Sequence, residues 1–353
     1  MNNPITGAEI LLQSLLNHDV NTIFGYPGSC VMQVLDCLYS RKELMNHILV
    51  RHEQGAVHAA QGYAEVSKKV GVALLTSGPG ATNTVTGIAD AMANAIPIVV
   101  ITGQVNSNLL GTDAFQEVDI IGITHSITKW VYQVRSAGEI SSAIAHAFYI
   151  ASTGRPGPVL LDITKDAQSE KAMYISQQTS FIRSYNPTQD SEKCEKLTPT
   201  DTADMNKNMQ NRIIGIMQDM DDDLIIVLDF ARLSNLNEPI SHEIVKSEKF
   251  GTLGFGLPAA IGAKCAAPDK IVCLIVEAAQ FQATIEELGV VMQSGIDIKI
   301  FLLNHPHEDN PDFIRLVDAY NIKGEVVLEQ KYLKKDIQKV LYSKGAFVLE
   351  VRI

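Results

Sequence analysis

The stretch GVALLTSGPGATNTVTGIADAMA, residues 71–93, decides the fold of this chain. Gly71 to Ser77 is an apolar run with the length of a buried strand, and Ala81 to Ala93 carries apolar residues at helical spacing. A turn of small residues, Ser77-Gly78-Pro79-Gly80, joins the two. A buried strand, a tight turn and a helix, in this order, predict one unit of a parallel sheet with covered faces.

The same alternation extends to both sides of this stretch. In the first part of the chain, the other predicted strands are 21–25, 47–51, 97–103 and 158–164, and the other predicted helices are 8–16, 31–39, 54–67 and 140–151. In the last part, the predicted strands are 224–229, 271–276, 298–304, 324–328 and 347–351, with helices at 257–265, 284–293, 311–319 and 333–341. Two doubly wound parallel-sheet α/β domains are therefore predicted.

The composition changes between these two parts. Residues 167–211 are rich in Ser, Thr, Gln, Asn, Asp and Lys and show no sustained apolar period, which predicts a polar tether. We predict domains at 1–166 and 212–353, joined by a linker at 167–211.

Charge and composition exclude several classes of function. The chain has 353 residues, 46% of them hydrophobic, and a net charge of −11, so we expect neither a nucleic-acid nor a membrane partner. The five cysteines lack metal-type spacing and favour buried, reduced thiols. We see no basic leader before an apolar run, and no apolar stretch approaches the ~20 residues of a membrane span. A soluble cytoplasmic enzyme is the expectation.

Glycine-rich turns follow two of the predicted strands, at Gly25–Ser29 and Ser77–Asn83. Such turns bring backbone N–H groups close to a ligand at the carboxyl edge of a parallel sheet. For each turn alone, tight packing between a strand and the following helix is the favoured explanation, and only the turns together indicate a ligand edge. Glu53, in RHEQGA directly after a strand, is by its spacing either a partner of the helix dipole or a catalytic group.

The surrounding motifs resolve this ambiguity. VRHEQGA (50–56), TSGPGATN (76–83) and GFGLPAA (254–260) resemble the thiamine-diphosphate enzyme superfamily. ITGQV (101–105), GTDAFQE (111–117) and GRPGP (154–158) resemble, within it, the acetolactate synthase large subunit family. The resemblance is dense from residue 5 to about 166 and returns from about 224 to the end.

The resemblance implies a fold, an activity and a set of site residues. The family decarboxylates pyruvate and joins the product to a second 2-keto acid, in branched-chain amino-acid biosynthesis. Its pyrimidine-binding domain faces a diphosphate-binding domain of another subunit, which implies a dimer or a higher homo-oligomer. The implied catalytic residues are Glu53, Phe115, Gln116, Lys129 and Lys165. The implied cofactor-binding residues are Gly28, Glu53, Gly78, Gly80, Asn83, Gln116, Gly251 and Leu253.

The chain departs from the family where the cofactor's Mg²⁺ should bind. Glu277-Ala278-Ala279-Gln280 aligns with the family's Gly-Asp-Gly-Ser, so the ligand aspartate becomes Ala278. His305 replaces the second Asn of an Asn-Asn pair. A methyl group and an imidazole cannot replace carboxylate and amide oxygens for Mg²⁺. We predict no metal site, and we interpret the polar loop from His305 to Asp309 as solvated.

Other departures are larger in extent. The family's flavin-binding middle domain, roughly 100–200 residues by ordinary domain size, has only the polar linker in its place, so FAD is not expected. The loop and helix that close over the substrate reduce to Pro306-His307-Glu308-Asp309. Leu253 replaces a methionine that supports the pyrimidine ring, and Ser29 replaces a glycine.

Three hypotheses follow. The chain could be a flavin-free acetolactate synthase, impaired or inactive alone, in effect a pseudoenzyme. It could instead be a half-site partner that lends its first domain to a complete homologue in a hetero-oligomer. The third hypothesis is an emptied cleft used for another small ligand, for which the sequence offers no positive indication.

Overall fold

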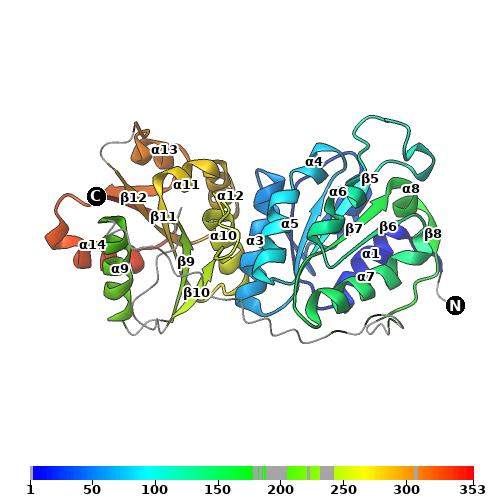
Figure 1. Cartoon of the computed structure of the whole chain (residues 1–353), viewed down its shortest axis with the longest axis horizontal. Coiled ribbons are helices and arrows are strands. Elements are labelled where there is room, and N and C mark those ends of the chain that lie inside the picture. Colours follow the sequence, from blue (N-terminus) through cyan, green and yellow to red (C-terminus); the bar gives the residue numbers. More distant parts are fainter. Residues whose placement is uncertain are drawn as a thin grey trace. The chain divides into compact units, whose positions relative to one another are not determined.

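The computed structural model describes residues 3–177, 182, 185, 187, 205–220, 223–230, 242–305 and 309–353. These fall into two compact units, one drawn mainly from residues 3–187 and the other mainly from residues 205–353 (Figure 1). Each unit contains a six-stranded parallel sheet flanked by helices, which confirms the predicted α/β class. No helix in the described ranges is long and apolar enough to span a bilayer.

The first sheet has the strand order β3-β2-β4-β5-β7-β6. Its strands are β2 (Thr22–Gly25), β3 (Asn46–Leu49), β4 (Gly71–Leu75), β5 (Ile98–Gln104), β6 (Trp130–Val134) and β7 (Val159–Thr164). The helices are α1 (Gly7–Asn17), α2 (Met32–Ser40), α3 (Glu53–Ser67), α4 (Pro79–Thr82), α5 (Val85–Asn94), α6 (Ile120–Thr124), α7 (Ala137–Ser152) and α8 (Lys165–Ser169). Helices α1 and α7 pack together against one face of the sheet, and α3 and α5 cover the other (Figure 1).

The second sheet has the order β10-β9-β11-β12-β14-β13. Its strands are β9 (Leu224–Asp229), β10 (Glu243–Lys246), β11 (Ile271–Glu277), β12 (Ile298–Asn304), β13 (Lys323–Val326) and β14 (Phe347–Arg352). The helices are α9 (Met205–Gln218), α10 (Gly256–Ala266), α11 (Ala278–Ala283), α12 (Leu288–Ser294), α13 (Phe313–Ala319) and α14 (Leu333–Leu341). In chain order, both sheets run second, first, third, fourth, sixth, fifth, so the two units share one topology.

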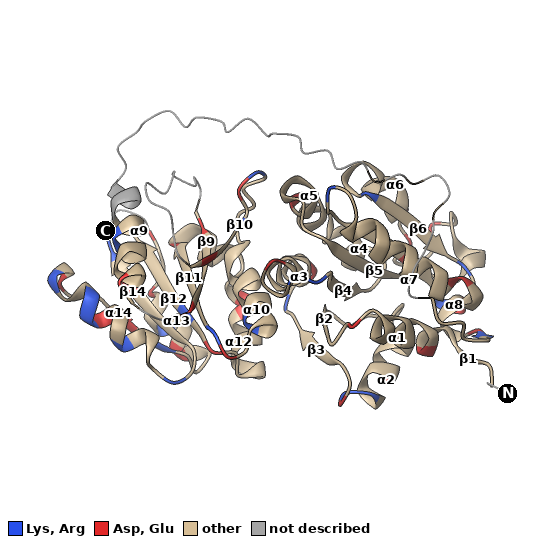
Figure 2. Ribbon diagram, turned by 90° about the horizontal axis from the view of Figure 1, so that it is seen from below, with Lys and Arg blue, Asp and Glu red and all other residues tan. Residues whose placement is uncertain are grey.

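Amphipathic patterning explains how the helices attach. Helix α14 buries Leu333, Ile337, Val340 and Leu341 against the sheet, while its lysines lie on the opposite side, where Figure 2 shows them in blue. Apolar residues at i, i+4, i+7 and i+8 form one stripe of a helix, and burying that stripe stabilises its docking.

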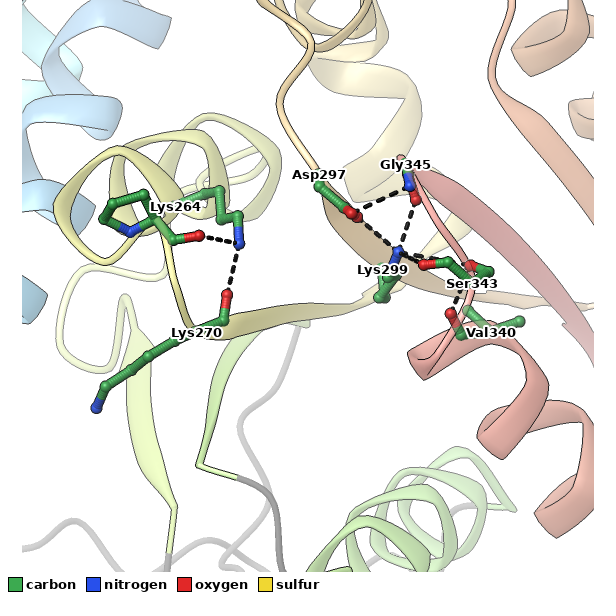
Figure 3. A network of polar contacts seen from close by, with 8 residues as sticks. Lys264, Lys270, Asp297, Lys299, Val340, Ser343 and Gly345 are labelled. Carbon is green, nitrogen blue, oxygen red and sulfur yellow. Dashed lines mark hydrogen bonds and ion pairs between the residues drawn. The ribbon is translucent and has the colours of Figure 1, made fainter.

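A buried lysine secures one end of the second sheet (Figure 3). Lys299, near the start of β12, is 3% exposed, and its Nζ donates to Asp297 Oδ1 at 2.6 Å. It also donates to the carbonyls of Ser343 and Gly345, at 2.7 and 2.6 Å. These contacts hold the loop before β14 in place. Because the Lys299 ammonium is paired and hydrogen-bonded, its burial has a structural explanation and does not require a functional role.

Several elements differ from the sequence prediction. Strands β6 and β10 lie at or near sheet edges and are only partly buried, so they lack the continuous apolar run by which the other strands were found. The predicted helix 81–93 divides into α4 and α5 around Asn83 and Thr84.

The predicted linker is wrong at both ends. Ala167 is buried in α8, and β8 (Lys171–Ala172) pairs antiparallel with β1 (Ile5–Thr6), so this end belongs to the first unit. Helix α9 begins at Met205, inside the predicted linker. Most of the remainder lies outside the described residues.

Candidate functional site

The candidate site lies at the carboxyl edge of the first sheet. Because the strands are parallel, the segments that follow β2, β3, β4, β5 and β7 all emerge at this edge. The predicted residues Gly28, Glu53, Gly78, Gly80, Asn83, Phe115, Gln116 and Lys165 are all in these segments. The topology therefore gathers residues that are far apart in the sequence.

Glu53 is held by a direct contact with Asn83. It is the first residue of α3, and the amide nitrogen Nδ2 of Asn83 donates to Glu53 Oε2 at 2.9 Å. The His52 ring caps the same helix by accepting from Gln54 N at 3.1 Å. Glu53 Oε1 lies 3.4 Å from the point where a Cβ on Gly80 would sit. One carboxylate oxygen is thus fixed, and the other lies beside Gly80, which has no side chain.

Close contacts within the unit account for the three glycines. A Cβ on Gly28 would overlap the Thr76 side chain, and one on Gly80 would lie 2.6 Å from Thr76 Cγ2. Gly78 has φ +58° and ψ −124°, and its Cβ would lie 2.8 Å from the carbonyl oxygen of Gln116. Tight packing therefore requires all three glycines, as one of the two sequence interpretations held. Their role in binding a cofactor remains a prediction.

Gln116 and Phe115 lie on the segment between β5 and α6. Gln116 has φ +60°, a conformation that costs energy in a residue with a Cβ, and its backbone packs against Gly78. The Phe115 side chain is 86% exposed.

The two lysines do not lie together. Lys129 directly precedes β6 and therefore lies at the amino edge of the sheet, opposite Glu53. Its Nζ donates to the carbonyls of Ile150 and Thr153, the latter at 2.6 Å, and burial lowers the pKa of its ammonium. Within this unit Lys129 and Glu53 therefore lie at opposite edges of the sheet, and the role of Lys129 in the site remains a prediction. Lys165 is exposed at the carboxyl edge, and its role in the site remains a prediction.

The second unit arranges the equivalent edge differently. Ala278, where the resemblance places a metal-binding aspartate, is 1% exposed at the start of α11. Asn304 ends β12 with both polar atoms engaged: Nδ2 donates to Glu350 Oε1 at 3.0 Å, and Oδ1 accepts from Asn310 Nδ2 at 2.8 Å. Gln282 donates in turn to Asn310 Oδ1 at 2.9 Å.

This edge does not fit a hard divalent cation. Ala278 has no side-chain oxygen to offer, and the only side-chain oxygen of Asn304 already accepts a hydrogen bond from Asn310. Within the described ranges, no three His, Cys, Asp or Glu side chains lie close enough together to hold a metal ion. His307 and Glu308 of the predicted solvated loop lie outside those ranges.

Gly251 and Leu253, the predicted cofactor contacts of this unit, precede α10. Gly251 has φ +70° with open space around it, and Leu253 is 53% exposed. The buried Asp229, at the end of β9, accepts from Gly256 N at 2.7 Å, so a carboxylate of the chain itself caps α10. No contact links Gly251 or Leu253 to a function, and their role remains a prediction.

Sequence reasoning missed one buried carboxylate near the candidate site. Asp162 in β7 is fully buried and accepts from Thr102, Gln104 and Gln133. Burial raises the pKa of its carboxyl to about 6, although the three donors act in the opposite direction. A single acidic residue within the apolar run 158–164 was the available signal.

Comparison with known proteins gives two family matches and many relatives. Residues 5–123 match the thiamine pyrophosphate enzyme N-terminal TPP binding domain, and residues 227–307 match the C-terminal TPP binding domain. The acetolactate synthase large subunit of Cyanidium caldarium is 29% identical over 541 positions, which cover 98% of this chain and 92% of that protein. Since this chain has only 353 residues, a long internal segment of that relative has no counterpart here.

Two further matches cover only about half of this chain but have higher sequence identity. The acetolactate synthase large subunit of Haemophilus influenzae is 50% identical over 186 residues, covering 52% of this chain and 32% of that protein. That of Pyropia yezoensis is 54% identical over 173 residues, covering 48% of this chain and 29% of that protein.

Proposed function

This chain carries the N- and C-terminal TPP binding domains of thiamine pyrophosphate enzymes and is a homologue of acetolactate synthase large subunits, and we propose that it supplies one half of a shared site. In this proposal its first unit provides the pyrimidine side of a thiamine-diphosphate site. The diphosphate side, with its Mg²⁺, comes from a complete homologue in a mixed oligomer.

The contrast between the two carboxyl edges carries the proposal. At the first edge, the Asn83 contact fixes the Glu53 carboxylate beside Gly80. At the second edge, Ala278 lacks a ligand atom and Asn304 is already hydrogen-bonded on both sides. The changes that remove cofactor chemistry therefore fall on the second unit, while the first keeps its predicted carboxylate in place.

Glu53 is the group through which the first unit acts. When bound in a complete site, thiamine diphosphate supplies the carbon nucleophile that adds to a 2-keto acid. A carboxylic group at Glu53 holds or transfers a proton at Oε1, the oxygen left free by the Asn83 contact. Asn83 keeps the carboxylate in one orientation, so no rearrangement is needed when a ligand arrives.

The proposal also concerns substrate and autonomy. In this proposal the substrates of the mixed oligomer are pyruvate and a second 2-keto acid, as the resemblance to acetolactate synthases implies. The chain alone is inactive or strongly impaired, and FAD has no role in it. Thiamine diphosphate with Mg²⁺, titrated into the isolated chain by calorimetry, is expected to give no detectable heat.

Complementation tests the proposal directly. The chain is coexpressed with a complete acetolactate synthase whose own glutamate equivalent to Glu53 is replaced by Gln, and mixed oligomers are isolated through two different tags. The wild-type chain is expected to restore acetolactate formation. Glu53→Gln is expected to lower it by at least about 100-fold, the usual contribution of one acid–base group.

Glu139→Gln serves as the matched control, because Glu139 lies on α7 and its carboxylate accepts hydrogen bonds from Tyr132 and Ser136. It should complement like the wild-type chain. Mixed oligomers that form but show equal activity with Glu53 and with Gln at this position would refute the proposal.

A further inference from the structure

Asp162 lies at the centre of a buried polar cluster that spans three strands. Its Oδ1 accepts from Thr102 Oγ1 in β5 at 2.7 Å. Its Oδ2 accepts from Gln104 Nε2 in β5 and from Gln133 Nε2 in β6, both at 3.1 Å. A buried carboxylate that receives three hydrogen bonds orients its donors strongly, because each donor would otherwise be left unsatisfied.

Of the three donors, Gln104 also contacts the segment 105–118. It is the last residue of β5 and is 1% exposed. Its Oε1 accepts from Val105 N at 2.9 Å, and its Nε2 also donates to the carbonyl of Val118 at 3.0 Å. One side chain therefore joins the beginning of the segment 105–118 to its end. A separate tie, from Ser107 N to Asp166 Oδ1 at 3.0 Å, holds the segment near Lys165.

The segment 105–118 contains Phe115 and Gln116, two of the predicted residues of the candidate site. Gln116 has φ +60°, and its backbone lies against Gly78. A strained residue keeps its conformation only if the surrounding structure holds it there. The clamp at Gln104 lies at the base of this segment and is suited to that purpose.

The second unit contains the same device at the equivalent position. In the first sheet Asp162 pairs in register with Thr102, two residues before Gln104; in the second, Glu350 pairs with Leu302, two residues before Asn304. Glu350, 2% exposed, accepts from Asn304 Nδ2, and Asn304 then contacts Asn310 in the following segment. In both units a buried carboxylate on the sixth strand holds an amide at the end of the fourth.

We infer that Asp162, acting through Gln104, is a positioning residue that holds the segment 105–118 and thereby places Gln116 beside the Gly78 turn. The inference rests on the proposed function only in its consequence for activity. The clamp itself is a property of the first unit and is measurable without any cofactor or partner.

The chain offers a matched pair of variants. Gln104→Ala and Gln133→Ala each remove one 3.1 Å hydrogen bond to the same oxygen of Asp162, but only Gln104 contacts the segment. Asp162→Asn is the conservative variant: its oxygen can face the two amides while its NH₂ faces Thr102, whose hydroxyl can accept as well as donate.

Hydrogen exchange of the full chain is the test. Gln104→Ala should raise exchange of the amides in 105–118 by about tenfold or more, because the segment opens locally. Gln133→Ala and Asp162→Asn should leave it close to wild type. Equal acceleration by Gln104→Ala and Gln133→Ala, or none by either, would overturn the inference. Asp162→Ala, which removes the acceptor of Gln104, should raise exchange in 105–118 as Gln104→Ala does, and wild-type exchange in a folded Asp162→Ala would also overturn the inference. If Asp162→Ala does not fold, the Gln104 and Gln133 pair still tests the clamp.

Activity of the mixed oligomer separates this inference from the proposed function. If the wild-type chain complements, Gln104→Ala should lower kcat while Gln133→Ala does not. If the wild-type chain fails to complement but the exchange result holds, the proposed function falls and the clamp stands. If exchange in Gln104→Ala is unchanged, the inference about the clamp is refuted even where complementation succeeds.

Discussion

In the first unit the third strand of the sheet is followed by Ser77-Gly78-Pro79-Gly80, and in the second by Glu277-Ala278-Ala279-Gln280. Both segments lead into a short helix on the same topology. The first turn leaves the Glu53 carboxylate beside a glycine, whereas the second buries a methyl group. A few side chains at strand ends thus decide what an edge can bind, while the sheet beneath remains the same.

The buried supports of the two edges differ much less than the edges do. Asp162 with Gln104 and Glu350 with Asn304 occupy equivalent places, and each pair joins the sixth strand to the end of the fourth. The two units therefore share the buried contacts beneath their carboxyl edges and differ in the side chains at the edges themselves.

The largest expected effect comes from an attempt to make the second edge resemble its relatives. Ala278→Asp places a carboxylate at a position that is 1% exposed, and it should destabilise the second unit by about 3–5 kcal/mol, as an uncompensated buried charge does. Ala279→Asp, at the exposed neighbouring position, should cost less than about 0.5 kcal/mol. Urea unfolding followed by circular dichroism measures both.

Mg²⁺ should not restore the stability of Ala278→Asp. A variant that is stable and melts higher in Mg²⁺ would show that only one ligand separates the two edges. The proposed contrast between the two carboxyl edges would then be wrong, because the second edge would retain a nearly complete cation site.

The sequence predicted the fully buried strands better than the partly exposed ones. The apolar runs identified every fully buried strand, since burial on both faces leaves a continuous signal. Strand β6 gave no such signal, because Tyr132 and its neighbours are partly exposed. The sequence also did not show that Lys129 directly precedes β6, because β6 itself gave no signal.

Side-chain contacts were the least predictable feature. The ambiguity at Glu53 was resolved by motifs, but its contact with Asn83 depends on how α4 ends, which the pattern 81–93 concealed. Asp162 and Glu350 were passed over within apolar runs. A lone acid in a buried strand has to find partners from other strands, and those partners are visible only in three dimensions.

The glycine turns provide a second comparison between the units. Gly78→Ala combines a backbone conformation reserved for glycine with a Cβ 2.8 Å from the Gln116 carbonyl oxygen. It should destabilise the first unit by about 3 kcal/mol, whereas Gly251→Ala, at φ +70° with open space, should cost the second unit about 1 kcal/mol.

Trp130, the only tryptophan, lies in the first unit, so its fluorescence reports the unfolding of that unit, and circular dichroism reports both. Equal costs for the two substitutions would mean that the Gly78 turn yields to the added methyl group. Close packing around Gly78 would then no longer count as a difference between the two edges.

The buried carboxylate of the first unit should also make its stability depend on pH. The folded pKa of Asp162 is raised to about 6 from 3.8, so its stabilising contribution is complete below about pH 4 and is lost as the pH rises through 6. Relative to Asp162→Asn, the wild-type unit should lose roughly 2–3 kcal/mol between pH 4 and 7. Urea unfolding by Trp130 fluorescence at each pH measures the difference, and parallel curves for the two proteins would contradict it.

The smallest expected effect is none at all, from adding Mg²⁺ to the wild-type chain. A cation that binds only the folded state at 100 times its Kd adds about 2.7 kcal/mol, which is a shift of several degrees in Tm. Because Ala278 offers no ligand and Asn304 Oδ1 accepts from Asn310, about 5 mM Mg²⁺ with thiamine diphosphate should leave the melting of both units unchanged. A complete acetolactate synthase serves as the positive control. If the second unit alone melts higher, Asn304 must exchange its hydrogen bond with Asn310 for a metal, and its edge differs from that of its relatives in affinity and not in kind.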